Sequence, residues 1–117
     1  LNKLWWDIVE KYQLVRRPEG RNEPDWAAKI HIVTSPVYYH NYMLGEMIAS
    51  QLHHYIATVV LEQDPGSTDI YGRREVGDYL KNVVYKPGAL YRWDRHIEVV
   101  TGEPLTPRYF VEQFVNA

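Results

Sequence analysis

The chain has 117 residues, 45% of them hydrophobic, with a formal net charge of -2 and no cysteine. This length and apolar content support one modest domain with a buried core and exclude a disordered tail. The slightly acidic balance lacks the basic surface that binds nucleic acid, and the absence of cysteine excludes thiol catalysis, thiolate-bound metal and disulfides.

The first predicted element is an amphipathic helix over residues 1–14. Its apolar residues recur at helical spacing and line one face: Leu1, Leu4, Trp5, Ile8, Val9 and Tyr12. Residues 16–28 follow as a polar connector rich in turn formers. Because the chain begins inside a helical pattern, without a methionine or a leader, we expect it to be part of a longer protein. No apolar run reaches the roughly 18 residues of a transmembrane helix, so no membrane span is expected.

The stretch from Lys29 to Thr34 is predicted to be extended, because β-branched residues dominate it. Ser35 and Pro36 then predict the start of a helix, with serine as the N-cap and proline in the first turn. One long helix is expected over residues 37–63, apolar on much of its circumference, as in a central buried helix. The turn formers at 64–67 end it.

Three shorter helices are predicted after this turn. One spans residues 73–85 and is broken by the Pro-Gly pair that follows. The next spans residues 90–100 and ends at Gly102, which supplies a left-handed C-terminal cap. Thr106 and Pro107 begin the last helix. The sequence therefore predicts an all-α fold of about five helices with one long central helix.

No local metal-binding motif is present, and His-Glu-x-x-His in particular does not occur, so no metal ligand is assigned in this chain. His53 and His54 are adjacent, so on a helix they point about 100° apart and do not easily share one ion. Surface or packing roles are the simpler interpretation of this pair.

A set of hydrogen-bond donors is concentrated between residues 29 and 42. In an extended stretch Lys29 and His31 project to the same side, because side chains alternate. Tyr39 and Tyr42 lie three residues apart and so share a face of a helix near its N-terminus. One cation, one imidazole and two phenols suit the binding of a carboxylate and the stabilisation of an oxyanion. The alternative is an exposed lysine, an ordinary histidine and tyrosines that only pack.

Several short motifs follow one another along the chain. They are Trp5-Trp6 with Tyr12-Gln13, Ala28-Lys29-Ile30-His31-Ile32, Asp69-Ile70-Tyr71 with Glu75, Gly77 and Leu80, and finally Glu98-Val99-Val100-Thr101-Gly102-Glu103-Pro104. In these motifs and their order the chain resembles the C-terminal region of the angiotensin-converting-enzyme family of zinc peptidases. The resemblance implies a larger, two-lobed helical fold around a deep cleft. Residues 1–117 would be the C-terminal segment of its catalytic domain.

The resemblance also implies a function, the removal of dipeptides from the C-terminus of oligopeptides by a zinc-dependent peptidyl-dipeptidase. The zinc ligands would lie in the upstream part of the same polypeptide, so the fragment alone is expected to be inactive. The substrate would be a peptide with a free C-terminus, and the family suggests an exported protein, periplasmic or extracellular. The alternative is a non-catalytic helical peptide-binding or interaction module from a degenerate relative.

Residue roles follow from the same resemblance. Lys29 is similar to the lysine that pairs with the substrate's C-terminal carboxylate. His31 is similar to the histidine that hydrogen-bonds a substrate carbonyl near the scissile bond. The family also has two tyrosines three residues apart, of which the earlier helps to bind the carboxylate and the later donates its hydroxyl to the oxyanion.

The register of the two tyrosines depends on the loop before them. Counting straight from the histidine places them at Tyr38 and Asn41, whereas one inserted residue gives Tyr39 and Tyr42 and restores both phenols. We therefore assign Tyr42 as the catalytic tyrosine and Tyr39 as the substrate-binding one, with Tyr38 as the alternative to Tyr39. Asn41 stands where chloride-activated members have an arginine, which makes chloride dependence doubtful.

Overall fold

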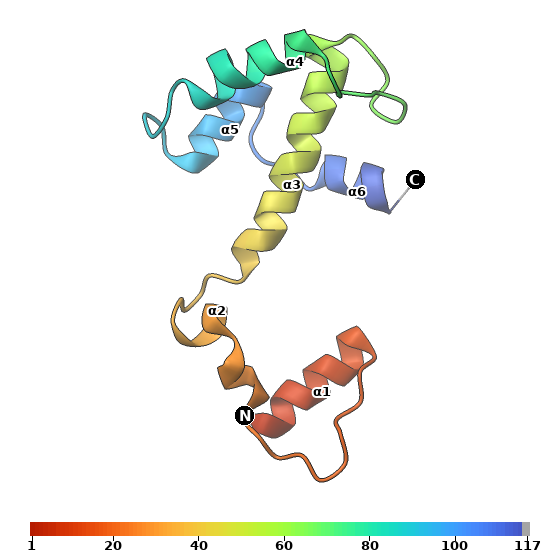
Figure 1. Cartoon of the computed structure of the whole chain (residues 1–117), viewed down its shortest axis with the longest axis vertical. Helices are drawn as coiled ribbons and strands as arrows, with labels where there is room; N and C mark the ends of the chain where they lie inside the picture. Colours follow the sequence, from red (N-terminus) through yellow and green to blue (C-terminus); the bar gives the residue numbers. More distant parts are fainter. Residues whose placement is uncertain (116–117) are drawn as a thin grey trace. The chain divides into compact units, whose positions relative to one another are not determined.

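The computed structural model describes residues 1–115, and every regular element in them is a helix. This confirms the predicted all-α class. The chain forms two compact units, Leu1–Asn41 and Tyr42–Ala117 (Figure 1). Each unit is described by itself below.

The first unit begins with α1, Asn2–Gln13, within one residue of each predicted end. Val9 is buried on its apolar face. Leu14 ends the helix in a left-handed conformation with φ 58°, and its N–H donates to the Glu10 carbonyl at 3.1 Å. The helical spacing of apolar residues therefore predicted this element correctly.

The connector after α1 is more ordered than its polar composition indicates. Its last residues form a short 3-10 helix, η1, at Asp25–Ala28. Trp26 Nε1 donates to Asn2 Oδ1 at 2.9 Å, and Asn2 Nδ2 donates to the Asn22 carbonyl at 2.8 Å. These two bonds tie the connector to the start of α1.

The predicted extended stretch at 29–34 is wrong. Ile30–Val33 form one helical turn, α2, in which the N–H groups of Ile32 and Val33 donate to the Lys29 carbonyl at 3.0 and 3.2 Å. Thr34 Oγ1 adds a bond to the Ile30 carbonyl at 2.7 Å. An extended segment needs a neighbouring strand to satisfy its N–H and C=O groups, and residues 1–115 contain none. The turn satisfies these groups locally.

The long helix starts later than predicted. Ser35 and Pro36 lie in a turn, Val37 takes a left-handed φ of 58°, and α3 begins only at His40. The α-helix spans His40–Tyr55 and continues as a π-helical segment, η2, at Ile56–Val60. A β-branched residue at positive φ interrupts a helix, which explains the late start.

Only part of α3 is central and buried. Its C-terminal half and η2 bury Ser50, Gln51, Ile56 and Ala57, whereas Met43 near the N-terminus is 60% exposed. The apolar residues around the helix predicted at 37–63 therefore indicated more burial than is observed in the described residues.

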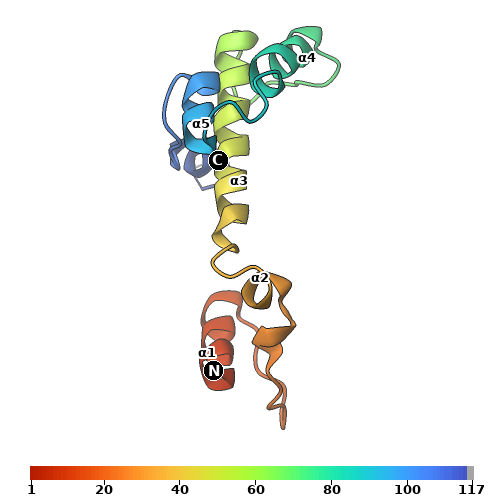
Figure 2. The same cartoon turned by 90° about the vertical axis from the view of Figure 1, so that its left-hand side faces the viewer.

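The remaining helices of the second unit follow the predicted order. They are α4 at Arg74–Tyr79 with the π-helical η3 at Leu80–Tyr85, α5 at Trp93–Thr101, and α6 at Arg108–Phe114. The start of α5 lies three residues after the predicted position, but Gly102 ends it in the expected left-handed conformation with φ 79°. In Figure 2, α4 and α5 flank the C-terminal half of α3.

A buried glutamine joins α3 to the end of α5 and the segment after it. Gln51 is 1% exposed, and its Nε2 donates to Thr101 Oγ1 at 2.8 Å and to the Glu103 carbonyl at 3.2 Å. Its Oε1 accepts the N–H of Thr106 at 3.0 Å. Because buried polar groups are costly unless paired, this amide specifies how the segment at 101–106 lies against α3.

Tyr79 connects three helices of the second unit. Its ring lies 5.6 Å from that of Tyr55, and its hydroxyl donates to the Val100 carbonyl. Burial, and secondarily the neighbouring Tyr55, raises the pKa of Tyr79 to about 12. The fold therefore favours the neutral phenol.

Tyr79→Phe is expected to lower the free energy of unfolding by roughly 1 kcal/mol at neutral pH, because one hydrogen bond is lost. A raised folded-state pKa means that the unfolded state, with its ordinary pKa of about 10, loses its proton first. In the parent protein this stability contribution is complete below pH 10 and is lost as the pH rises toward 12. Urea unfolding of the intact protein between pH 8 and about 11.5 should show a shallower alkaline decline of the free energy of unfolding in the variant.

Tyr71→Phe, at a tyrosine that is 89% exposed, is the matched control. Equal alkaline slopes in Tyr79→Phe and the parent would contradict the assignment.

Candidate functional site

Three of the residues singled out from the sequence meet around the short helix α2 in the first unit. His31 is the second residue of α2, and its ring is stacked with that of Tyr38, with centroids 6.1 Å apart and planes 18° apart. The ring of Tyr39 meets the same imidazole edge-on, at 5.3 Å and 77°. Tyr38 and Tyr39 are 46% and 53% exposed. The structure thus brings both candidate tyrosines to the histidine.

Lys29 precedes α2 as its N-cap, with an extended backbone and an exposed side chain. Among residues 1–115, no carboxylate lies within ion-pair distance of its ammonium group. The prediction that strand alternation places Lys29 and His31 on one side is wrong, because residues 30–33 are helical. The charge of Lys29 is nevertheless available to a ligand.

Val37 lies between α2 and the two tyrosines, and its left-handed φ of 58° is unusual for a β-branched residue. Such a conformation costs on the order of 1 to 3 kcal/mol and persists where surrounding structure requires it. Here it reverses the chain after α2, so that the segment at 38–39 returns to the His31 ring.

Tyr42 belongs to the second unit, where it is the third residue of α3 and is 53% exposed. Tyr39 lies in the turn before α3 begins. The expectation that Tyr39 and Tyr42 share a helix face is therefore wrong in its reasoning, because the first of them is not helical.

Residues 1–115 contain no group of three or more His, Asp or Glu side chains placed to hold a metal ion, so they do not fit a zinc site of their own. None of the helices formed by these residues combines the length and apolar composition that a membrane span requires.

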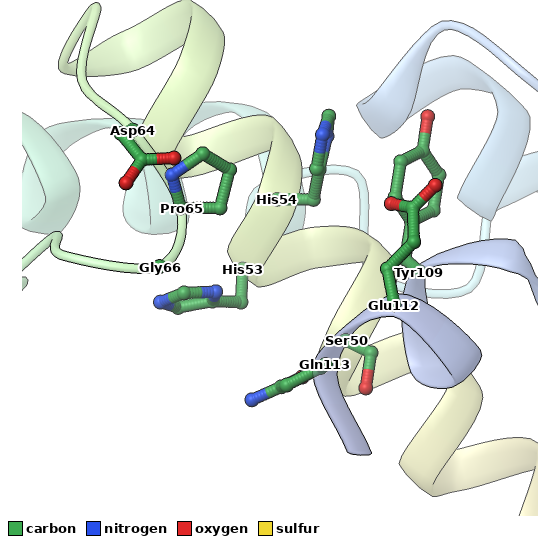
Figure 3. A pocket seen from close by; sticks show the side chains of 9 residues that line it. All are labelled: Ser50, His53, His54, Asp64, Pro65, Gly66, Tyr109, Glu112 and Gln113. Carbon is green, nitrogen blue, oxygen red and sulfur yellow. The ribbon is translucent and has the colours of Figure 1, made fainter. Parts of the chain in front are cut away.

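A pocket in the second unit was missed by the sequence analysis. It has a volume of about 550 Å³ and is lined by residues of α3, of the turn after η2 and of α6: Ser50, His53, His54, Asp64, Pro65, Gly66, Tyr109, Glu112 and Gln113 (Figure 3). Burial, and secondarily a hydrogen bond to Glu103, raises the pKa of Tyr109. The adjacent histidines and the Asp-Pro-Gly turn were visible signals. That these residues lie next to α6 depends on the tertiary fold and could not be predicted from the sequence.

The chain was compared with known proteins. The family model described as "Angiotensin-converting enzyme" matches residues 1–114. Proteins named angiotensin-converting enzyme from Oryctolagus cuniculus and Bos taurus are 33% and 32% identical, over 88% and 87% of this chain. The angiotensin-converting enzyme-like protein Ace3 of Mus musculus is 31% identical over 87% of the chain. The aligned region is 8% of the rabbit and bovine proteins and 14% of the mouse protein, so the chain spans a small part of each. No solved structure matches significantly.

Proposed function

The chain belongs to the angiotensin-converting enzyme family, and from that premise we propose that it is the substrate-binding C-terminal segment of a peptidyl-dipeptidase catalytic domain. The protein that contains it removes dipeptides from the free C-terminus of oligopeptides. The observation that carries the proposal is the contact of the His31 imidazole with the rings of both Tyr38 and Tyr39. An exposed lysine, Lys29, lies two residues before this histidine.

In the proposal, Lys29 and Tyr39 bind the terminal carboxylate of the substrate. The ammonium group of Lys29 is exposed and is within ion-pair distance of no carboxylate in residues 1–115, so it is accessible to an incoming anion. A charge-assisted hydrogen bond to a carboxylate is about twice as strong as a neutral one. A phenol adds a second donor, with Tyr38 as the alternative source. Because the terminal carboxylate is bound at a fixed place, the cleaved bond lies a fixed number of residues from the C-terminal end of the substrate.

His31 and Tyr42 act nearer the bond that is cleaved. His31 donates a ring N–H to a substrate carbonyl, and contacts with two tyrosine rings restrict the orientation of its imidazole. Tyr42 donates its hydroxyl to the oxyanion that develops when the carbonyl is attacked. Donors that are already oriented toward developing charge lower the barrier, because they need no reorganisation during the reaction.

The described residues do not fit a zinc site, so the zinc ion of the full enzyme and its ligands are assigned to other parts of the polypeptide. Such an ion would activate the attacking water. This chain's own residues are assigned only to binding the substrate and to donating hydrogen bonds.

Residues 1–117 alone are expected to release no dipeptide from an unblocked chromogenic tripeptide, even with added zinc, because the proposal assigns the zinc ligands and the general base to other parts of the polypeptide. The intact protein should cleave the same peptide, and a chelator should abolish the cleavage. Chelator-sensitive activity in the isolated chain would contradict the division of roles. An intact protein that binds the peptide without cleaving it would instead indicate a non-catalytic peptide-binding relative.

A further inference from the structure

The pocket of about 550 Å³ in the second unit has no role in the proposed function, and none of its lining residues is a lysine or arginine. Two carboxylates, Asp64 and Glu112, are among its lining residues, together with two histidines and the amide of Gln113. Figure 3 shows His53 and the 64–66 turn on one side, with Tyr109 and Glu112 on the other. A concave surface with this charge favours positively charged ligands, and its volume lies within the usual range of small-molecule sites.

Ser50 provides a second, independent indication of a ligand. Its side chain lines the pocket, yet the residue is only 4% exposed. Its hydroxyl makes no hydrogen bond with any group of residues 1–115. Because this hydroxyl has no partner within residues 1–115, a ligand that enters the pocket can supply one without displacing a protein group.

The wall formed by α6 is held in place by contacts of Tyr109 and Arg108. The ring of Tyr109 packs on His54 with centroids 4.1 Å apart, and its hydroxyl donates to Glu103. Arg108 donates to the same hydroxyl and pairs with Glu103 at 3.2 Å. This arginine lies four residues before Glu112 on α6; it pairs with Glu103 and also interacts electrostatically with Glu112.

We propose that this pocket binds an organic cation, a guanidinium or primary amine, borne by a small molecule or by a basic side chain of a peptide. Asp64 and Glu112 supply the attraction, and the Ser50 hydroxyl accepts an N–H from the cation. The packed rings of His54 and Tyr109 offer an apolar wall to the alkyl part of the ligand. The inference goes beyond the proposed function, because it involves none of Lys29, His31, Tyr39 or Tyr42.

The test is a calorimetric titration of the intact protein with Nα-acetyl-arginine amide. Its neutral isostere, Nα-acetyl-citrulline amide, is the ligand control. The arginine derivative is expected to bind at least about tenfold more tightly, and binding should weaken as salt rises from 0.05 to 0.5 M. Agmatine, which has no peptide groups, distinguishes a free small molecule from a peptide side chain as the preferred source. Equal affinity for the arginine and citrulline derivatives would overturn the proposal.

Matched variants locate the binding. Glu112→Gln and Asp64→Asn should each weaken it by about tenfold, and Ser50→Ala by severalfold. Glu10→Gln removes the same charge from an exposed residue of α1 and should leave binding unchanged. Lys29→Ala should also leave it unchanged, because the amide ligand has no free carboxylate. Undiminished binding in both Glu112→Gln and Asp64→Asn would overturn the proposal even if the peptidase assignment holds.

Discussion

Tyr42→Phe in the intact protein is expected to lower kcat by about 100- to 1000-fold, the usual effect of losing one oxyanion donor, while KM changes little. The reason is that a donor to the oxyanion acts in the transition state and contributes little to ground-state binding. Steady-state kinetics on an unblocked chromogenic tripeptide measures both constants. Phenylalanine keeps the ring, so the packing of this exposed residue of α3 should be preserved.

Control variants show whether the fall in kcat is specific to Tyr42 or follows from removing any tyrosine hydroxyl. Tyr71→Phe, at an 89% exposed tyrosine of the second unit, should leave kcat unchanged. Tyr39→Phe should raise KM more than it lowers kcat, because its hydroxyl is assigned to the carboxylate. If Tyr38→Phe has that effect in its place, the alternative register is correct. Near-parental turnover in Tyr42→Phe would refute the catalytic assignment.

The second large effect is expected for Lys29→Ala. Its kcat/KM for a peptide with a free C-terminus should fall by about 10- to 150-fold, since a hydrogen bond to a charged group contributes roughly 1.5 to 3 kcal/mol. The same peptide with a C-terminal amide has no carboxylate to bind, so the variant and the parent should cleave it equally slowly. Parallel assays of the two peptides measure the ratio directly.

Lys86→Ala removes an exposed lysine from the second unit and is the matched control. It should preserve the preference for the free acid. Lys29→Arg keeps the charge with different geometry, so it should recover part of the lost activity. A Lys29→Ala variant that loses activity equally on acid and amide would show that the lysine supports the fold and does not recognise the terminus.

Helices whose determinants are local could be predicted from the sequence. The apolar stripe of α1 and the left-handed Gly102 after α5 each depend on a few neighbouring residues, and both were placed to within about one residue. The chemistry at 29–42 was found by residue type, and the structure then brought His31 to both candidate tyrosines.

The errors arose where tertiary context overrides local preference. β-branched residues at 30–33 favour a strand, but no strand among residues 1–115 is available to pair with them, so they form a helical turn. Ser35 and Pro36 resemble a helix start, yet Val37 adopts a left-handed backbone and delays α3 to His40. Neither effect is encoded in a short window of sequence.

Gln51 and the second-unit pocket show that the surroundings of polar groups, too, cannot be predicted from local sequence. A glutamine within an apolar helix can face solvent or the core, and only the segment at 101–106 makes burial favourable by satisfying its amide. Likewise, Ser50 and Glu112 are 62 positions apart in sequence and line one pocket only because α6 lies near α3. Partners this distant cannot be identified from spacing alone.

In the proposed function, this chain recognises the free C-terminal end of a peptide and thereby fixes where the intact protein cuts. Mass spectrometry of the first products from an unblocked octapeptide tests it most directly. The expected first products are a C-terminal dipeptide and the matching hexapeptide, with little release from the amidated octapeptide. Cleavage at internal bonds, or equal release from the free and amidated peptides, would contradict it.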